Sequence, residues 1–472
     1  MSKFYITTAI AYANAKPHLG HALEFVQADV LARYHNFLGH EVKYATGMDE
    51  NGLKNYRAAQ QAGKETLGYL DEIADSFKKL DELYDVVYTD FVRTTADYHK
   101  QASQAIWKAA AKTGDIYKKS YKGLYCVGCE TFKTASELRD GKCPLHPNLT
   151  LEEVEEENYF FKLSKYQDEL LDFYEKNPEF VVPNEKFNEL KRFVESGLED
   201  ISISRPKDKL PWGIPVLDDP QHVMYVWFDA LTNYISVIGY GQKGREKEFQ
   251  RWWPADVHVI GKDIVRFHGA IWPAILLSAG LELPKQLFVH GFLSSGGQKM
   301  SKTTGNVIDP IPLAEKYGAE AARAFLLSEI PTLDDADVTL ERIDAFYHGV
   351  LSNGLGNLLQ RTLTLINNAG FKPSPGAKPS CADVWKHIEE YQLHEAMRAV
   401  WTMVGNANQE VDREKVWELV KSDKKKAEKV LLSLYRQLET IGAALAPLVP
   451  GTSRRILQQL KTLKPEPLFP RK

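Results

Sequence analysis

The sequence predicts an α/β protein whose parallel sheet comes from two separated stretches of chain and is followed by a helical bundle. Strand-like and helix-like segments alternate over residues 4–113, and the alternation returns from about residue 216. Residues 115–215 differ, because short aromatic and lysine-containing strands there surround clustered cysteines, and we expect an insertion. No strand pattern is evident after about residue 336, where amphipathic helices are expected.

The composition is that of an ordinary globular protein. The chain has 472 residues, 44% hydrophobic and 26% charged, with a net charge of −4, which excludes a globally basic nucleic-acid binder but not a local basic patch. Three of its four cysteines cluster, unlike a disulfide framework. With no leader pattern at the start and no run of about 18 apolar residues, we expect a cytosolic protein with no membrane partner. The chain is expected to be a monomer.

The first predicted strand covers residues 4–10 and leads into a helix whose apolar residues recur every three or four positions. Between them lies the segment Tyr12 to His21, which ends in His18-Leu19-Gly20-His21. Open α/β sheets bind ligands at such a turn, where backbone N–H groups favour anions. Both imidazoles can face one phosphate group there, and Gly20 lets the backbone approach closely. A histidine pair alone is more often an ordinary surface or core feature.

The other elements follow along the chain. Further strands are predicted over 41–46, 223–228, 256–260 and 286–290. Helices are predicted over 52–62, 66–84, 98–112, 164–176 and 185–198, and from Asp229 and about Asp263. The chain contains neither G-x-G-x-x-G nor a P-loop motif, so a nicotinamide dehydrogenase or P-loop ATPase has no support.

A second candidate segment is the Gly/Ser-rich loop around Lys299-Met300-Ser301-Lys302. Two lysines in such a loop supply cations that can close over a polyphosphate. Taken alone, a solvated basic loop is an equally good interpretation.

Together, H-L-G-H and K-M-S-K-T resemble the paired H-I-G-H and K-M-S-K-S motifs of class I aminoacyl-tRNA synthetases. The resemblance implies a Rossmann-like catalytic domain that activates an amino acid with ATP and transfers it to tRNA. It implies catalytic roles for His18, His21, Lys299 and Lys302, with His18, Gly20 and His21 at the α- and β-phosphates and the lysines at pyrophosphate. Mg²⁺ is expected to accompany ATP, held mainly by the phosphates.

Asp263 follows a predicted strand and precedes a helix. A carboxylate there can accept both ribose hydroxyls of ATP, as acids do in other nucleotide-binding sheets. A helix N-cap is the alternative.

The resemblance extends over essentially the whole chain to the methionyl-tRNA synthetase family, through residues 11–18, 47–52, 226–231 and 261–273. It implies a methionine pocket whose thioether packs against aromatic rings, with Asp49 holding the α-ammonium group. The implied pocket residues are Ile10, Tyr12, Trp227, Ala230, Tyr234, His268 and Trp272. Singly, each aromatic is more often a core residue. The chain departs from the family at Ala9, Ala11 and Asn51, where Pro, Tyr and His are frequent.

Cys126, Cys129, Cys143 and His146 have the C-x-x-C and C-x-x-H spacing of a zinc knuckle. Thiolates and an imidazole suit tetrahedral Zn²⁺, and four protein ligands imply a structural site. The alternative is four unconnected side chains, and many relatives use a fourth cysteine in place of His146. Cys381 is expected to be simply buried.

Asn357, Arg361 and Trp417 resemble the family's anticodon-reading positions. Arginine and tryptophan can stack on unpaired bases, and asparagine can read a base edge. Here Val416 replaces the usual proline, and a helix-face arginine with a core tryptophan is the alternative. The partners implied are ATP, methionine and tRNA(Met), both initiator and elongator.

The predicted domains are a first nucleotide-binding half (1–114), a zinc-bearing connective insertion (115–215), a second half (216–290), a junction with the lysine loop (291–335) and a helical anticodon-binding domain (336–472). Ligases for isoleucine, valine or leucine carry a far larger insertion, and a cysteine ligase needs zinc ligands in its substrate pocket. A catalytically silent relative is disfavoured by the intact histidine and lysine motifs. A nucleotide-binding protein without an RNA partner would leave the helical bundle unused.

Overall fold

The computed structural model describes residues 2–129, 131–133, 138–144, 146–295, 297–299, 308–374, 376 and 379–470. The chain forms two compact units. Unit 1 contains Met1–Pro17, His40–Lys79 and Val87–Val289, and unit 2 contains His18–Gly39, Leu80–Val86 and His290–Lys472.

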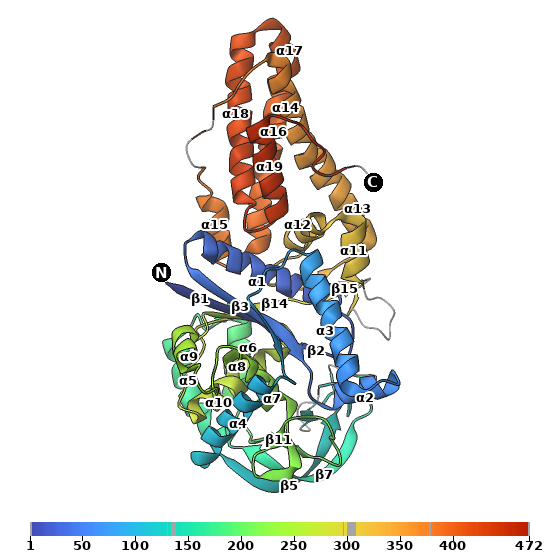
Figure 1. Cartoon of the computed structure of the whole chain (residues 1–472), viewed down its shortest axis with the longest axis vertical. Helices are drawn as coiled ribbons and strands as arrows, with labels where there is room; N and C mark the ends of the chain where they lie inside the picture. The colour runs from blue at the N-terminus through green and yellow to red at the C-terminus, as the bar shows by residue number, and fades with distance from the viewer. Residues whose placement is uncertain are drawn as a thin grey trace. The chain divides into compact units, whose positions relative to one another are not determined.

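A parallel sheet forms the centre of unit 1 (Figure 1). Its strand order is β2-β3-β1-β13-β14-β8, and β4 pairs with β3. The strands are β1 (Lys3–Thr8), β2 (Ala11–Tyr12), β3 (Glu41–Asp49), β4 (Asp90–Arg93), β8 (Val181–Val182), β13 (Val257–Gly261) and β14 (Leu287–His290). Ile6 of β1 lies opposite both Tyr44 of β3 and Val257 of β13, so strands far apart in sequence are neighbours. This confirms the predicted split sheet.

The helices of unit 1 bury apolar faces, most of them in one large core with the sheet. They are α2 (Leu53–Gln61), α4 (Asp97–Lys112), α5 (Gln167–Lys176), α6 (Asn184–Glu195), α7 (Val226–Leu231), α8 (Asn233–Ser236), α9 (Glu246–Trp252) and α10 (Trp272–Ser278), and α3 (Thr66–Leu83) begins in this unit. In α4, Ile106, Trp107 and Ala110 are buried at helical spacing, which explains why this segment is a helix. The predicted helices over 52–62, 66–84, 98–112, 164–176 and 185–198 are confirmed within a few residues.

The prediction of a strand over 223–228 is partly wrong. Strand β12 covers Asp219–Met224, and α7 begins at Val226 rather than at Asp229. All six residues of α7 are buried, so its β-branched and aromatic side chains reflect burial rather than strand structure. A helix buried on every side has no polar face to reveal its period.

The expectation that all the insertion's strands are short is also wrong. Strands β5 (Ile116–Cys126) and β7 (Glu152–Phe161) form a long antiparallel ladder in a sheet with β6 (Thr131–Lys133) and β9 (Ile201–Ser202). In the ladder Lys122 lies opposite Glu155, and diagonal ion pairs join Lys122 to Glu153 at 2.8 Å and Lys118 to Glu157 at 3.6 Å. Opposite charges on facing strands stabilise such pairing, so the glutamate run can be a strand.

A smaller antiparallel sheet joins β12 to β10 (Ser204–Pro206) and β11 (Pro215–Val216). Strand β8, from the range predicted as the insertion, pairs in parallel with β14. The domain boundaries given above stay a prediction.

Unit 2 is mainly helical. Its helices are α1 (Leu19–Phe37), α11 (Pro310–Tyr317), α12 (Ala319–Glu329), α13 (Leu340–Phe346), α14 (Asn357–Ala369), α15 (Ala382–Glu389), α16 (Leu393–Arg413), α17 (Val416–Ser422), α18 (Lys424–Ala444) and α19 (Pro450–Thr462), and a π-helical segment (Tyr347–Gly356) precedes α14. A small sheet contains β15 (Leu293–Ser295), β16 (Gln298–Lys299) and β17 (Ala336–Asp337). The predicted bundle of helices after residue 336 is therefore confirmed.

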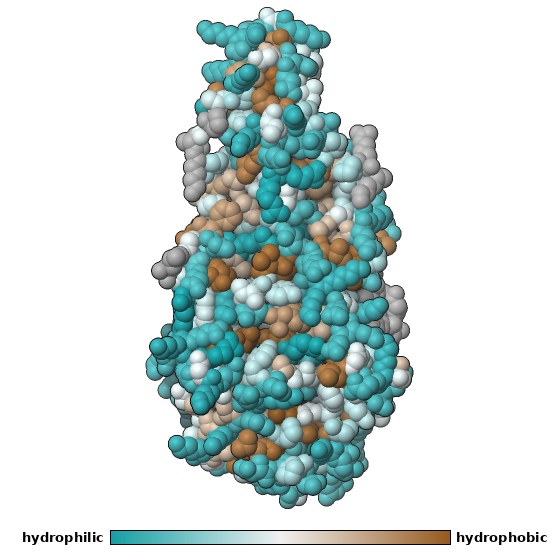
Figure 2. Space-filling view, in the orientation of Figure 1, coloured by the Kyte–Doolittle hydropathy of each residue, from teal (hydrophilic) through white to brown (hydrophobic). Residues whose placement is uncertain are grey.

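Polar residues dominate the face of the molecule in Figure 2, and the hydrophobic ones there are scattered among them. Among the described residues, no helix is long and apolar enough to span a membrane.

Candidate active site

His18 and His21 lie at the N-terminus of α1 in unit 2. His18 is the N-cap, and its Nδ1 accepts a hydrogen bond from the Gly20 N–H at 3.1 Å. The Nδ1 of His21 accepts from the His18 N–H, also at 3.1 Å. The two rings stack with their centroids 3.8 Å apart. A Cβ at position 20 would lie 2.9 Å from Cε1 of His18, so the stacked arrangement requires glycine there.

These backbone contacts fix what the two imidazoles can offer a ligand. A neutral imidazole that accepts at Nδ1 carries its proton on Nε2. Burial lowers the pKa of His21 well below its ordinary value, and nearby His18 and His290 lower it further. The site therefore presents two Nε2–H donors side by side at the positive end of a helix, an arrangement suited to phosphate oxygens.

Sequence reasoning did not single out His290, the last residue of β14. Its Nε2 lies 2.9 Å from Oε2 of Glu24, one turn along α1 from His21, and its Nδ1 lies 2.8 Å from the Gly291 carbonyl oxygen. A lone histidine after a strand carries no motif, so only the structure shows its place beside the pair.

The predicted methionine residues all belong to unit 1. At their centre the Tyr234 hydroxyl lies 2.7 Å from Nε2 of His268, and the Nδ1 of His268 lies 2.9 Å from the Ile264 carbonyl oxygen. Burial lowers the pKa of His268 to about 4, so the ring is neutral at physiological pH. Its single proton is then on Nδ1, donated to the carbonyl, and Nε2 accepts from the tyrosine.

Aromatic rings surround this pair. The Trp227 ring stacks on Phe267 at 3.6 Å between centroids, and it meets Tyr12 and His268 edge-on at 6.5 Å each. The Trp272 ring lies 6.2 Å from that of Tyr234. Among the described residues, the indole N–H groups of Trp227 and Trp272 are buried without a hydrogen-bond partner. The structure therefore brings these predicted residues together in an apolar, aromatic cluster.

The remaining predicted residues lie as follows. Asp49 ends β3 and is buried, Ala230 is buried in α7, and Ile10 is half-buried. Asp263 is exposed in a 3₁₀ turn (Lys262–Ile264) whose N-cap is Gly261, so it does not cap the helix. The backbone of Lys299 is in β16, and Lys302 lies outside the described residues.

The cysteine cluster of unit 1 has the geometry of a metal centre. One ligand atom from each of Cys126, Cys129, Cys143 and His146 lies within 4.8 Å of the other three. The Sγ atoms of Cys129 and Cys143 are 3.5 Å apart, and all four cysteines of the chain are described and free of disulfide bonds. A Cβ at position 128 would lie 2.5 Å from the His146 ring, so Gly128 makes room for that ligand. Three thiols and an imidazole gathered in this way fit Zn²⁺.

The predicted anticodon residues meet on helices α14 and α17 of unit 2. Asn357 and Arg361 are one turn apart on α14, and the Arg361 guanidinium lies 4.7 Å from the Trp417 ring centroid. Arg361 also pairs with Asp412 at 2.8 Å. Trp417 is 37% exposed, so it is not a core residue.

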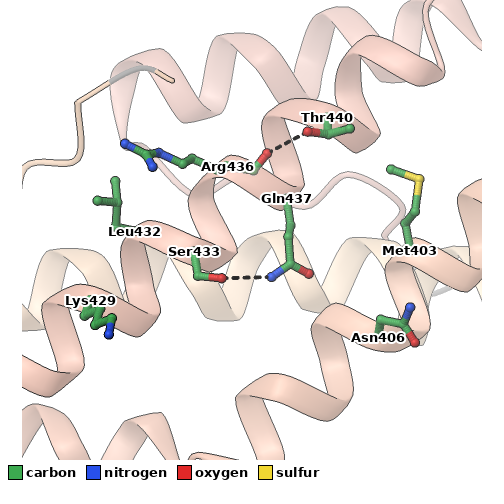
Figure 3. A pocket seen from close by; sticks show the side chains of 8 residues that line it. All are labelled: Met403, Asn406, Lys429, Leu432, Ser433, Arg436, Gln437 and Thr440. Carbon is green, nitrogen blue, oxygen red and sulfur yellow. Dashed lines mark hydrogen bonds between the residues drawn. The ribbon is translucent and has the colours of Figure 1, made fainter. Parts of the chain in front are cut away.

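An open groove of about 660 Å³ lies between α16 and α18 (Figure 3). The residues that line it are Met403, Asn406, Lys429, Leu432, Ser433, Arg436, Gln437 and Thr440. None of these residues was predicted to belong to a site.

Comparisons with known proteins identify the family of the chain. The model of the family "tRNA synthetases class I (M)" matches residues 4–149 and 137–363. The methionine--tRNA ligase of Caldanaerobacter subterraneus subsp. tengcongensis is 42% identical over 97% of this chain and 74% of its own length. That of Brucella suis biovar 1 is 43% identical over 97% of this chain and 92% of its own length.

Solved structures give the same result. The structure of Mycobacterium tuberculosis methionyl-tRNA synthetase in complex with methionyl-adenylate is similar with a TM-score of 0.90 at 38% identity, covering 100% of this chain and 99% of that one. The apo form of that enzyme is similar with a TM-score of 0.81 at 35% identity, covering 100% of this chain and 97% of that one. The chain therefore belongs to the methionine--tRNA ligase family of class I tRNA synthetases.

Proposed function

We propose that this chain activates methionine with ATP to methionyl-adenylate and pyrophosphate, and then transfers the methionyl group to the 3′ end of tRNA(Met). The observation that carries the proposal is the stacked pair of His18 and His21, with both Nδ1 atoms held by backbone N–H groups at the start of α1. This pair supports the phosphate chemistry, and membership of the ligase family supports the identity of both substrates.

In the first step the methionine carboxylate attacks the α-phosphate of ATP and pyrophosphate leaves. Negative charge grows on the phosphate oxygens, and donors already in place at those oxygens lower the barrier. The Nε2–H groups of His18 and His21 supply such donors at the α- and β-phosphates. Lys299 and Lys302 supply cations for the departing pyrophosphate, and Mg²⁺ accompanying ATP would supply further neutralising charge.

Methionine is selected by the aromatic cluster of unit 1. Its flexible thioether packs against Trp227 and Trp272, while Asp49 holds the α-ammonium group. His268, which is neutral and hydrogen-bonded to Tyr234, places no positive charge in the pocket. This supports a substrate with an uncharged side chain, such as methionine. Asp263 is exposed, which leaves its carboxylate available to the ribose hydroxyls.

Zn²⁺ bound by Cys126, Cys129, Cys143 and His146 has a structural role, because four protein ligands leave no coordination position for a substrate. Asn357, Arg361 and Trp417 bind the anticodon. The exposed tryptophan next to the arginine supports stacking on unpaired bases.

Charging of a tRNA(Met) transcript with labelled methionine tests the whole proposal. The unaltered chain should form methionyl-tRNA, and Arg361→Ala should raise the KM for tRNA about tenfold, because a lost base-stacking contact costs about 1–3 kcal/mol. Methionine-dependent pyrophosphate exchange should stay unchanged in that variant. Arg398→Ala, which removes another ion-paired arginine on the helical unit, is the matched control. Absence of charging by the folded, zinc-loaded chain would refute the proposal.

A further inference from the structure

Unit 1 also contains a buried polar cluster to which the proposed reaction assigns no role. Its members are Asn51, His99, Asp229 and Ser236, each no more than 4% exposed. The Asn51 amide donates to Oδ2 of Asp229 at 2.6 Å, and Nε2 of His99 lies 2.6 Å from the other carboxylate oxygen. Ser236 Oγ lies 2.9 Å from Nδ1 of His99.

The protons of this cluster can be assigned from the groups themselves. A carboxylate only accepts, and the Asn51 nitrogen only donates. The 2.6 Å contact with Asp229 places a proton on Nε2 of His99, and the Ser236 hydroxyl, which lies 2.9 Å from Nδ1 of His99, donates to the Asn233 carbonyl oxygen at 3.2 Å. Each carboxylate oxygen of Asp229 thus has a donor within 2.6 Å, as a buried carboxylate requires.

The polar cluster lies next to the predicted methionine-pocket residues in the sequence. Asn51 follows Asp49 by two residues, and Asp229 lies between Trp227 and Ala230 on α7. The 2.6 Å bond therefore ties the loop after β3 directly to the helix that carries two methionine-pocket residues.

Further hydrogen bonds hold the loop after β3, so a displacement of Asn51 would also displace Asp49. The Asn55 amide donates to the carbonyl oxygens of Asp49 at 2.9 Å and Asn51 at 2.7 Å. The Asn51 amide also lies 3.3 Å from the Thr94 carbonyl oxygen. On the other side, His99 anchors the carboxylate to α4, and Ser236 connects it to α8.

We infer that Asp229 is a positioning residue that sets the distance between the ammonium-binding Asp49 and the side-chain-binding Trp227 and Ala230, through its bond to Asn51. The inference rests on the proposed function, in which Asp49 binds the ammonium group of methionine and Trp227 and Ala230 contact its side chain. We call the bond between Asn51 and Asp229, which joins these two parts of the pocket, the clamp. Neither Asn51 nor Asp229 touches ATP in this scheme. Loss of the bond between them should therefore weaken amino-acid binding selectively.

The test is Asn51→Ala in the full chain, with methionine and ATP varied separately in pyrophosphate exchange. We expect the KM for methionine to rise about tenfold, with the KM for ATP changed less than twofold. Asn51→His keeps an N–H donor that can reach the carboxylate and should restore the KM for methionine. The matched control is Asn158→Ala, which removes another buried amide donating to a buried carboxylate, that of Glu156, in the same unit.

A merely structural role would lower the active fraction or move both KM values together, and either result would overturn the inference. An unchanged KM for methionine in Asn51→Ala would overturn it as well. If Asn51→Ala does not fold, His99→Gln carries the same test, because it disturbs the carboxylate from the opposite side. Failure of the proposed function would be distinct, since the unaltered chain would then show no methionine-dependent exchange.

Discussion

At the scale of single residues, desolvation sets the protonation state of two histidines of the site. His268 is buried and His21 is half-buried, and desolvation lowers the pKa of both, so both are neutral hydrogen-bonding groups rather than cations. The motif spacing predicted that two histidines meet a phosphate. It did not predict that backbone N–H groups occupy both Nδ1 atoms, because that depends on the capping geometry of α1.

The first residue-scale prediction concerns His268. Its pKa is about 4 in the folded chain and about 6.5 when unfolded, so below pH 6.5 the unfolded state binds a proton that the folded state does not. Stability should therefore fall as pH drops from about 6.5 towards 4. His268→Gln should remove about 2 kcal/mol of the difference in unfolding free energy between pH 7 and pH 5. Denaturant unfolding at both pH values measures this, and an unchanged difference would contradict it.

The second residue-scale prediction concerns Asp81 in unit 2. Among the described residues, its two carboxylate oxygens are buried without a hydrogen-bond partner. Burial, together with Asp29 and Glu82, raises its pKa to about 8. Between about pH 4 and 8 the folded state holds a proton that the unfolded state releases, so stability falls as pH rises through that window.

Asp81→Asn removes this cost. We expect it to stabilise the chain by at least about 1 kcal/mol at pH 8, and by less at pH 5. Asp172→Asn, at an exposed position of α5 that takes no part in raising the Asp81 pKa, is the control and should change the unfolding free energy little. Equal effects of Asp81→Asn at the two pH values would contradict the account.

At the scale of elements, the spacing of apolar residues predicted the long helices correctly. It failed where a segment is buried on every side and has no polar face. Helices α3, α4 and α6 were predicted within a few residues because each has one apolar face. The first half of the buried α7, residues 226–228, was predicted as strand. The glutamate run of β7 was not recognised as a strand because its lysine partners lie on β5, far away in sequence. Short β4 was missed because four residues carry too little pattern.

The prediction at this scale concerns the metal knuckle after β5. Cys143→Ser should lower the zinc content well below one ion per chain and speed hydrogen exchange at the end of β5, since the metal would join Cys126 there to Cys143 and His146. Zinc analysis and hydrogen exchange measure both effects. Cys381→Ser, which alters a buried cysteine outside the cluster, should retain the zinc. Full zinc occupancy in Cys143→Ser would contradict the assignment.

At the scale of the whole molecule, each unit carries residues for a different part of the proposed chemistry. The His18–His21 pair and the Arg361–Trp417 pair belong to unit 2, whereas the aromatic cluster and the metal knuckle belong to unit 1. The sequence predicted the split sheet from its alternating pattern. It could not predict the clamp at Asp229, because the contact joins residues 178 positions apart that share no motif.

The central claim is that the aromatic cluster admits methionine and that the histidine pair activates it. Amino-acid-dependent exchange of pyrophosphate into ATP, measured without tRNA for methionine, leucine, isoleucine, valine and cysteine, tests both parts together. The account predicts exchange with methionine alone. Exchange with another of these amino acids would overturn the pocket assignment, and no exchange with any of them, in folded and zinc-loaded chain, would contradict the activation chemistry itself.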